Sequence, residues 1–479
     1  MDSASGDKVW RVPTVAIVAL CMIASIELFN LPLLLAALAV MAVAALAFIE
    51  PAGVMCAVLF SLPWFFHPIA TDSQVFAISE LLLLGAIIGI AGSVLSETIA
   101  ATNPLRKLRD MSISMLLQPL IWTILVLSIV GLILALRPYD PTHRADSFRE
   151  WRWTLLEPLT LMVMLTVVAG GRPRARALFA AALIAGATAA ALQAFSDFAI
   201  GGGIEFEGVT RIVGPYPHPN ALALYVTRVA ALALGWLVFN PSLRRWLLGP
   251  TIVVGAAVAA TFSRGALVAL ALSAGLVLPV LGRRPRLTVA TITVVAATAL
   301  VGIERERMLD LFGGGSGSLR IDIWTSAIQM IRDRPLRGYG PDQFLYAYVP
   351  RYIEPTAWNE RFTAHSHNLI FDFWIRLGII GGAFAIGAMV LGATRAYVVV
   401  IKDRASKADA LTAGAAVSLV AVLAHGMVDN AYFTHDLAMS GWFLAWLAFA
   451  PGTICVEGRT SSARPRRWRC WVHRLASVR

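Results

Sequence analysis

The stretch that decides the fold is residues 219–281, PNALALYVTRVAALALGWLVFNPSLRRWLLGPTIVVGAAVAATFSRGALVALALSAGLVLPVL. It holds three apolar segments in succession, 219–239, 247–262 and 265–281. A transmembrane helix needs about 20 mostly apolar residues, so each segment is a candidate span. The turns between them are short and contain arginine. This pattern predicts membrane helices joined by tight polar turns.

The same character extends over most of the chain, which has 58% hydrophobic and only 14% charged residues and a mean hydropathy of +0.71. Soluble domains carry about a quarter charged residues. We therefore predict an all-α, polytopic membrane helical bundle of about 12–14 transmembrane helices. The candidate spans are 13–29, 31–49, 52–67, 76–95, 114–135, 154–169, 177–198, 219–239, 247–262, 265–281, 287–303, 368–391, 409–427 and 437–450.

The net charge of +11 follows the loops, which argues against a nucleic-acid partner. With the N-terminus in the cytoplasm, every second loop is basic, and these inside segments hold 24 of the 40 Lys and Arg residues, including all four lysines. The positive-inside rule then predicts cytoplasmic N- and C-termini. The first helix is expected to be retained rather than cleaved. The basic tail, 451–479, either lies against anionic membrane lipids or is a plain stop anchor. Four dispersed cysteines indicate neither a disulfide framework nor a zinc cluster.

We expect three parts: N-terminal transmembrane helices at 1–200, a second transmembrane domain at 201–450, and the tail at 451–479. The second part contains one long outer loop, 304–367. This loop includes a helical stretch with Ile321, Trp324, Ile328 and Ile331 at helix-face spacing. Pro335 ends the helix, and a Gly-Tyr-Gly-Pro turn follows at 338–341. The helix either lies on the outer membrane interface or packs on the bundle as a lid.

Several cationic residues fall at the outer side. Arg211 opens RIVGPYPHPN, where it either faces an anionic headgroup with His218 and Asn220 or snorkels at the interface. Ser263-Arg264-Gly265 forms a whole outer turn, and a charge that close to hydrocarbon needs a partner or a function. Arg320 begins the loop helix, where it either clamps phosphate oxygens or pairs with Asp322.

Histidines and a carboxylate accompany these arginines. His365-Ser366-His367-Asn368 closes the outer loop, and histidine suits proton transfer near neutral pH. Either His365 or His367 is the candidate base, and Asn368 directly after His367 favours the latter. A metal site is disfavoured because a third ligand is not obvious nearby. Asp429 at the outer end of span 409–427 either balances the arginines or holds helices through a buried ion pair. The buried Arg228 needs a similar partner.

Topology therefore predicts that Arg211, Arg264, Arg320 and His367 share one side of the membrane, although they are far apart in sequence. Cations with a base, on a face without ATP, suit a substrate that already carries its energy, such as a lipid-linked pyrophosphate sugar. The arginines would stabilise the leaving diphosphate, and the histidine would take the proton of an acceptor hydroxyl.

These motifs resemble, in order, the O-antigen ligase/polymerase superfamily. The resemblance covers about 205–445 and rests on RIVGPYPHPN, TFSRGALVAL, GSLRIDIWTSAIQMIRDRPLRGYGPDQF, HSHNLIFDFWIRLGIIGG and HGMVDN. It implies metal-independent, inverting transfer of an undecaprenyl-pyrophosphate-linked glycan at the periplasmic face of the bacterial inner membrane, with no cofactor. It assigns catalysis to Arg264, Arg320 and His367 and substrate contacts to Arg211, His218, Asn220, His365, Asn368 and Asp429.

The favoured acceptor is the glycolipid lipid A-core, as in an O-antigen ligase. Within the family, a polymerase acting on a carrier-linked glycan is the alternative, and fourteen spans exceed the twelve usual in the ligases. A lipid-linked glycan flippase is an alternative of another class, but it would favour inverted repeats and broken mid-membrane helices, and no clear repeat is visible. A structural assembly subunit would not need clustered arginines.

Overall fold

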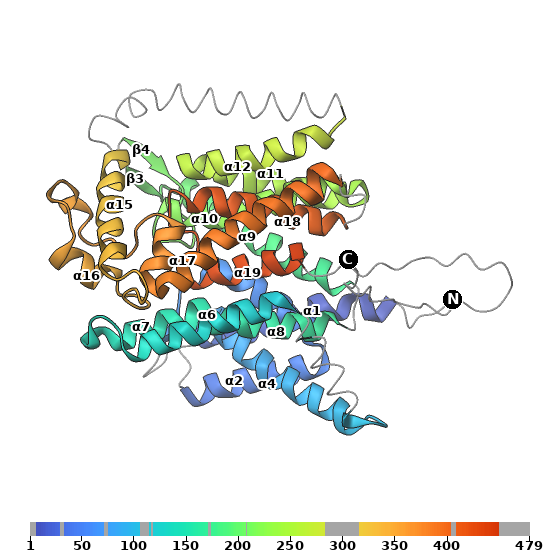
Figure 1. Ribbon diagram of the computed structural model, residues 1–479. Helices are drawn as coiled ribbons and strands as arrows, with labels where there is room; N and C mark the ends of the chain where they lie inside the picture. Colours follow the sequence, from blue (N-terminus) through green and yellow to red (C-terminus); the bar gives the residue numbers. More distant parts are fainter. Residues whose placement is uncertain are drawn as a thin grey trace, which may run out of the picture.

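The computed structural model describes residues 6–28, 33–70, 75–105, 115, 118–170, 174–206, 208–282, 316–403 and 409–449. It is an all-α polytopic membrane protein (Figure 1), as the composition predicted. Seven of the described helices are long and apolar enough to cross a membrane, and five more apolar helices are shorter. Every predicted span except 287–303 overlaps a helix, and 287–303 lies outside the described residues. The three-part division of the chain stays a prediction.

The helices of the N-terminal part are α1 (Gly6–Leu28), α2 (Leu33–Ile49), α3 (Pro51–Ser61), α4 (Ile78–Ile99), α6 (Pro119–Leu136), α7 (Arg144–Trp151), α8 (Glu157–Ala169) and α9 (Ala175–Ala199). A π-helical turn, Arg152–Leu156, joins α7 to α8. The short 3-10 helix Leu62–Trp64 continues α3. Predicted spans 52–67 and 154–169 therefore belong to helices with irregular extensions at one end.

The helices that follow are α10 (Pro219–Phe239), α11 (Arg244–Ala260), α12 (Arg264–Val277), α15 (Ser316–Asp333), α16 (Phe344–Arg351), α17 (Leu369–Ala396), α18 (Ala410–Gly426) and α19 (His435–Phe449). Two antiparallel hairpins complete the described structure. One pairs β1 (Ile69–Ala70) with β2 (Val75–Phe76), and the other pairs β3 (Ile204–Phe206) with β4 (Val209–Arg211). The long α15, the short α16 and the β3–β4 hairpin gather at one end of the bundle (Figure 1).

Polar contacts at the opposite end show how the helices alternate. Arg176, at the start of α9, donates to Asp409 at 3.0 Å and to the carbonyl oxygen of Leu447 at 2.8 Å. Arg395, near the end of α17, donates to the carbonyl oxygen of Ala448 at 2.8 Å. The starts of α9 and α18 therefore meet the ends of α17 and α19. This arrangement fits the alternation that the basic loops predicted.

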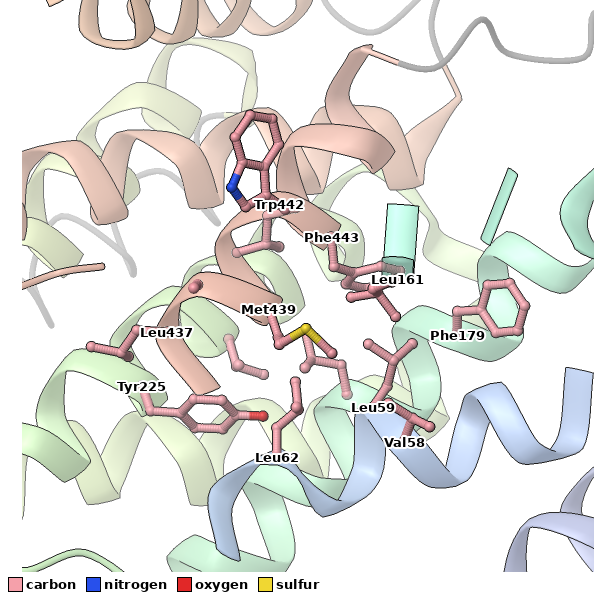
Figure 2. Packing of buried hydrophobic residues seen from close by; sticks show 14 of the residues in the cluster. Val58, Leu59, Leu62, Leu161, Phe179, Tyr225, Leu437, Met439, Trp442 and Phe443 are labelled. Atoms are coloured by element: carbon pink, nitrogen blue, oxygen red, sulfur yellow. The ribbon is translucent and has the colours of Figure 1, made fainter. Parts of the chain in front are cut away.

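One hydrophobic core joins early and late helices. Val58, Leu59 and Leu62 pack beside Leu161 of α8, and α19 contributes Met439 and Phe443 to the same cluster (Figure 2). Complete burial of a large apolar side chain contributes about 1.5–3 kcal/mol. Burial of these side chains therefore holds α19 in place within the bundle.

Arg228 of α10 is buried in this interior with 1% exposure. Its guanidinium donates to the carbonyl oxygens of Leu437 and Ala431 at 2.7 and 2.8 Å, and to the hydroxyl of Ser440 at 3.1 Å. The sequence predicted a buried partner for this charge. The structure supplies backbone carbonyls of the α18–α19 region, so Arg228 ties α10 to the start of α19.

The outer loop docks on α17 through close backbone contacts. Gly378 interrupts α17 with a φ of 63°, and a Cβ there would lie 2.1 Å from the carbonyl oxygen of Leu336. Tyr339 donates its backbone N–H to the carbonyl oxygen of Ile375 at 2.7 Å. Only glycine allows this approach at low cost. The predicted turn at 338–341 is thus held on the bundle.

Two local predictions need correction. Helix α15 forms as expected, but it packs through Ile323, Ala327 and Met330, while Ile321 is 57% exposed and Ile328 is 38% exposed. Of the predicted face, Ile331 packs against this cluster and Trp324 contacts Phe371, so the face that docks is shifted toward Ile323 and Met330. In addition, Arg264 already belongs to α12, so the outer turn is 261–263, and Phe262 has a φ of 50° there.

Candidate functional site

A cavity of about 510 Å³ lies at the end of the bundle where α10, α12, α17 and α19 begin. Segments far apart in sequence line it. Of the residues predicted from the sequence, all but Asn368 line it directly: Arg211, His218, Asn220, Arg264, Arg320, His365, His367 and Asp429. The predicted convergence of cations and histidines is therefore present in the fold, and the roles of these residues remain to be tested.

His367 and Asp429 form a hydrogen-bonded acid–imidazole pair in the cavity. The Nδ1 atom of His367 lies 3.0 Å from Oδ1 of Asp429, and the Asp429 side chain is 7% exposed. Burial alone would raise the pKa of Asp429, but the hydrogen bond from His367 and the neighbouring imidazoles lower it well below its usual range. Asp429 is therefore ionised, and it holds the imidazole with Nδ1–H toward the carboxylate. This orientation leaves Nε2 as the acceptor of a proton.

The sequence did not predict which residue pairs with Asp429. The sequence favoured a buried ion pair between helices, whereas the structure gives a histidine of the outer loop as the nearest partner. Arg320 stands further off, with Nη2 3.9 Å from Oδ2 of Asp429. The Asp322 carboxylate, the predicted alternative partner of Arg320, accepts instead from the hydroxyl of Thr356 at 2.7 Å.

His365 stands beside this pair. Its ring centroid lies 4.3 Å from that of His367, and its Nε2 is 3.9 Å from Oδ1 of Asp429. Burial and then the adjacent His367 lower the pKa of His365 well below its ordinary value. His365 is therefore neutral near pH 7. The closer contact to Asp429 makes His367 the better placed base.

Three guanidinium groups form the cationic wall of the cavity. Arg211 is buried, with Nε donating to the carbonyl oxygen of Thr261 at 2.5 Å and Nη2 donating to Oδ1 of Asn220 at 2.8 Å. It does not snorkel. Arg264 is the first residue of α12, after Ser263 caps that helix. Arg320, on α15, has a side chain that is 30% exposed. Guanidinium groups remain charged at any relevant pH, so this wall suits an anion.

A buried network of hydrogen bonds and ion pairs holds the loop that carries His365 and His367. The backbone N–H and the hydroxyl of Ser366 both donate to Oδ1 of Asp372, at 2.8 and 3.0 Å. Arg376 binds that same carboxylate at 3.1 Å and reaches Glu150 of α7 at 3.0 Å. All of these groups are buried. The network stabilises a strained conformation, because His367 has a φ of 54°.

Helix caps place three further residues that the sequence predicted. Nδ1 of His218 accepts the backbone N–H of Asn220 at 3.1 Å and so caps α10. Asn368 caps α17 by accepting from the N–H groups of Ile370 and Phe371. Its Nδ2 donates to the carbonyl oxygen of Met427 at 3.1 Å. Asn368 thus joins the histidine loop to the segment of Asp429, beneath the cavity.

The cavity also contains residues that the sequence reading missed. Thr363 lies within 3.4 Å of Nε2 of His367. Asn359 and Glu360 line the outer edge, and Tyr216 donates to Asp436 at 3.0 Å at the inner wall. Only their place in a polar loop, or next to a quoted motif, could have indicated them.

The potential metal ligands also differ from expectation. His365, His367 and Asp429 offer three ligand atoms within 4.8 Å of one another. The missing third ligand, which argued against a metal, is therefore present. Three arginines line the same cavity, and their charge opposes a divalent cation there. The expectation of metal-independent chemistry stays a prediction.

Together, the helices and the cavity indicate a multi-pass membrane protein with a cavity lined by arginines and histidines at one end of its helices. Residues 249–386 match the family described as O-antigen ligase. This match supports the resemblance to the O-antigen ligase/polymerase superfamily that the motifs predicted. It covers Arg264, Arg320 and His367, and it ends before Asp429. The chain matches no curated protein.

The match to this family supports a membrane enzyme of the O-antigen ligase or polymerase type. Such enzymes act in general on lipid-linked glycans and glycolipid acceptors.

Proposed function

We propose that the protein is a glycosyltransferase at the periplasmic face of the bacterial inner membrane. It moves a glycan from undecaprenyl pyrophosphate to an acceptor, and we favour lipid A-core as that acceptor. The observation that carries the proposal is the His367–Asp429 pair beside three arginines in one cavity.

The reaction starts with the donor diphosphate against Arg211, Arg264 and Arg320. Arginine binds phosphate oxygens with two parallel N–H groups, which orients the anomeric carbon as well as neutralising charge. As the bond from that carbon to the diphosphate oxygen breaks, negative charge grows on the leaving group. Guanidinium groups already in place stabilise this charge without reorganisation.

His367 acts on the other substrate. Its Nε2 accepts the proton of an acceptor hydroxyl while the hydroxyl oxygen forms the new bond to the anomeric carbon. Attack from the face opposite the diphosphate inverts the configuration at that carbon. Asp429 stabilises the imidazolium that results. The proton then leaves to water or to the released diphosphate, so no cofactor enters the balance.

Transfer by the purified, reconstituted protein tests this function. The donor is a defined undecaprenyl-pyrophosphate-linked glycan, offered with lipid A-core or with a second carrier-linked glycan. A product on lipid A-core supports the ligase. Lengthening on the carrier supports the polymerase instead. Movement of the donor across the bilayer without a new glycosidic bond would contradict both and favour a flippase.

A further inference from the structure

The outer edge of the cavity differs in chemistry from its cationic wall. We call residues 358–363, Trp-Asn-Glu-Arg-Phe-Thr, the rim segment. Asn359, Glu360, Phe362 and Thr363 of this segment line the cavity. These four residues offer an amide, a carboxylate, a hydroxyl and one aromatic ring, and the carboxylate repels a diphosphate. A second kind of ligand group is therefore expected here.

Glu360 is the residue of the rim segment that is most available to bind a ligand. Its side chain makes no hydrogen bond or ion pair with any residue that the structure describes. Burial and then Arg211 lower the pKa of His218, and Asp429 and then Glu360 act against them, so the Glu360 carboxylate lies within electrostatic reach of His218 across the cavity that both line. A carboxylate repels phosphate but accepts strongly from hydroxyl groups. Glu360 is thus suited to a neutral, hydroxyl-rich group.

Aromatic rings stand beside this carboxylate. Phe362 is 76% exposed and Trp358 is 54% exposed. The guanidinium of Arg361 lies 4.6 Å from the ring centre of Phe362 and 5.5 Å from that of Trp358, and it donates to the carbonyl oxygen of Trp358 at 3.0 Å. Phe362 lines the cavity, whereas Trp358 does not, so one exposed ring is presented to a ligand in the cavity. Its flat apolar face fits the C–H face of a sugar ring.

The rim segment is fixed to its neighbours on both sides. Just before it, Thr356 donates to Asp322 of α15 at 2.7 Å. At its end, Thr363 donates to the carbonyl oxygen of His365 at 3.1 Å and lies 3.4 Å from Nε2 of His367. A group bound to the rim segment is therefore next to the face of His367 that takes the proton. That position belongs to the attacking hydroxyl, not to the diphosphate.

We propose that the rim segment is the subsite for the terminal sugar of the acceptor. Glu360 and Asn359 accept and donate hydrogen bonds with its hydroxyl groups, Phe362 stacks on its ring, and one hydroxyl then lies at Nε2 of His367. This inference rests on the proposed function, because it names the acceptor side of the same site.

Steady-state transfer by the full-length protein in proteoliposomes tests the subsite. Both substrates are titrated for the wild type and for Glu360→Gln, Glu360→Ala and Phe362→Ala. We expect the KM for the acceptor to rise by about tenfold or more in the Glu360 variants, which lose a hydrogen bond to a charged group, and also to rise in Phe362→Ala, which loses the stacked ring. We expect kcat and the KM for the donor to stay within about twofold of the wild type, as for loss of binding alone.

Glu354→Gln is the matched control. Glu354 is a carboxylate of the same loop that accepts from Gln329 at 3.4 Å and does not line the cavity. We expect its kinetics to equal those of the wild type. An unchanged acceptor KM in all three rim variants would overturn the proposal. A raised donor KM instead would assign the segment to the donor and overturn it as well.

Two further outcomes separate the claims. If Phe362→Ala alters only incorporation into vesicles, the ring is a membrane anchor and the subsite is wrong. If the wild type transfers to neither acceptor, the proposed function fails. Direct binding of lipid A-core and of the carrier-linked glycan to nanodisc-embedded wild type and Glu360→Ala then decides the subsite alone. Equal affinity would refute it, and weaker binding by the variant would support it.

Discussion

Replacing Asp429 with asparagine isolates the role of one carboxylate. Asparagine keeps the shape and an oxygen that accepts the Nδ1–H of His367, but it removes the negative charge 3.0 Å from that nitrogen. Unit charges at this separation attract by about 5–6 kcal/mol at an effective dielectric constant of about 20. The imidazole is charged only after it takes the proton, so this attraction acts mainly on the transition state.

Two features reduce that figure. The His367 side chain is 20% exposed to solvent, and Arg320 also shares the carboxylate at 3.9 Å. We therefore expect a loss of about 3–4 kcal/mol, which corresponds to a kcat lower by about 10²–10³-fold. The affinity for the donor should change far less than kcat, because Asp429 contacts the cationic wall only through Arg320 at 3.9 Å.

The assay is the initial rate of transfer in proteoliposomes at saturating acceptor, with donor binding measured separately and thermal unfolding as the check of folding. Asp333→Asn is the matched control, because Asp333 accepts from Tyr352 at 2.7 Å and does not line the cavity. A folded Asp429→Asn protein with the kcat of the wild type would refute the assignment of Asp429 as the group that orients and stabilises His367.

Three other predictions follow from the same geometry. Arg264→Lys keeps the charge but loses the two-pronged contact, so we expect donor transfer to fall by about 10²-fold; unchanged activity would argue against bidentate binding. His365→Gln should lose much less kcat than His367→Gln, because His365 is already neutral and further from Asp429; equal losses in the two kcat values would contradict this. Burial and then Glu150 raise the pKa of Asp342 to about 7, so its contribution to stability is full below about pH 4, the ordinary pKa of an aspartate, and is lost as the pH rises from there to about 7. Thermal unfolding should therefore show Asp342→Asn more stable than the wild type at pH 8, by about 2 °C or more, with a difference that shrinks as the pH falls toward about 4; the opposite trend would remove this interpretation.

The membrane helices and their alternation could be predicted because lipid imposes a simple rule on the sequence. Each span must be long and apolar, and charge marks the loops. With the predicted spans, an odd number of membrane crossings precedes each of Arg264, Arg320 and His367. The three residues are therefore expected on the same side of the membrane. Their convergence in one cavity agrees with that count.

The partners within the cavity could not be predicted in the same way. His367 reaches Asp429 across 62 residues, and the contact depends on a left-handed backbone that no local pattern indicates. The face of α15 was also ambiguous, because apolar residues occur on both sides of that helix. Periodicity finds an apolar stripe, but only the packing of Ile323 and Met330 shows which stripe is buried.

Glu360 illustrates a different limit. A lone glutamate in a polar loop carries no signal, since most such residues are simply solvated. Its importance comes from a neighbourhood that the fold assembles: exposed rings on one side and the histidine pair on the other.

The central claim is that His367 performs the proton transfer while the arginines hold the diphosphate. A single-turnover experiment on His367→Gln separates the two, with donor affinity measured first and transfer to the acceptor followed afterwards. We predict donor binding equal to that of the wild type and a transfer rate lower by about 10²–10⁴-fold, the range of general-base catalysis. Full-rate transfer by this variant would contradict the account.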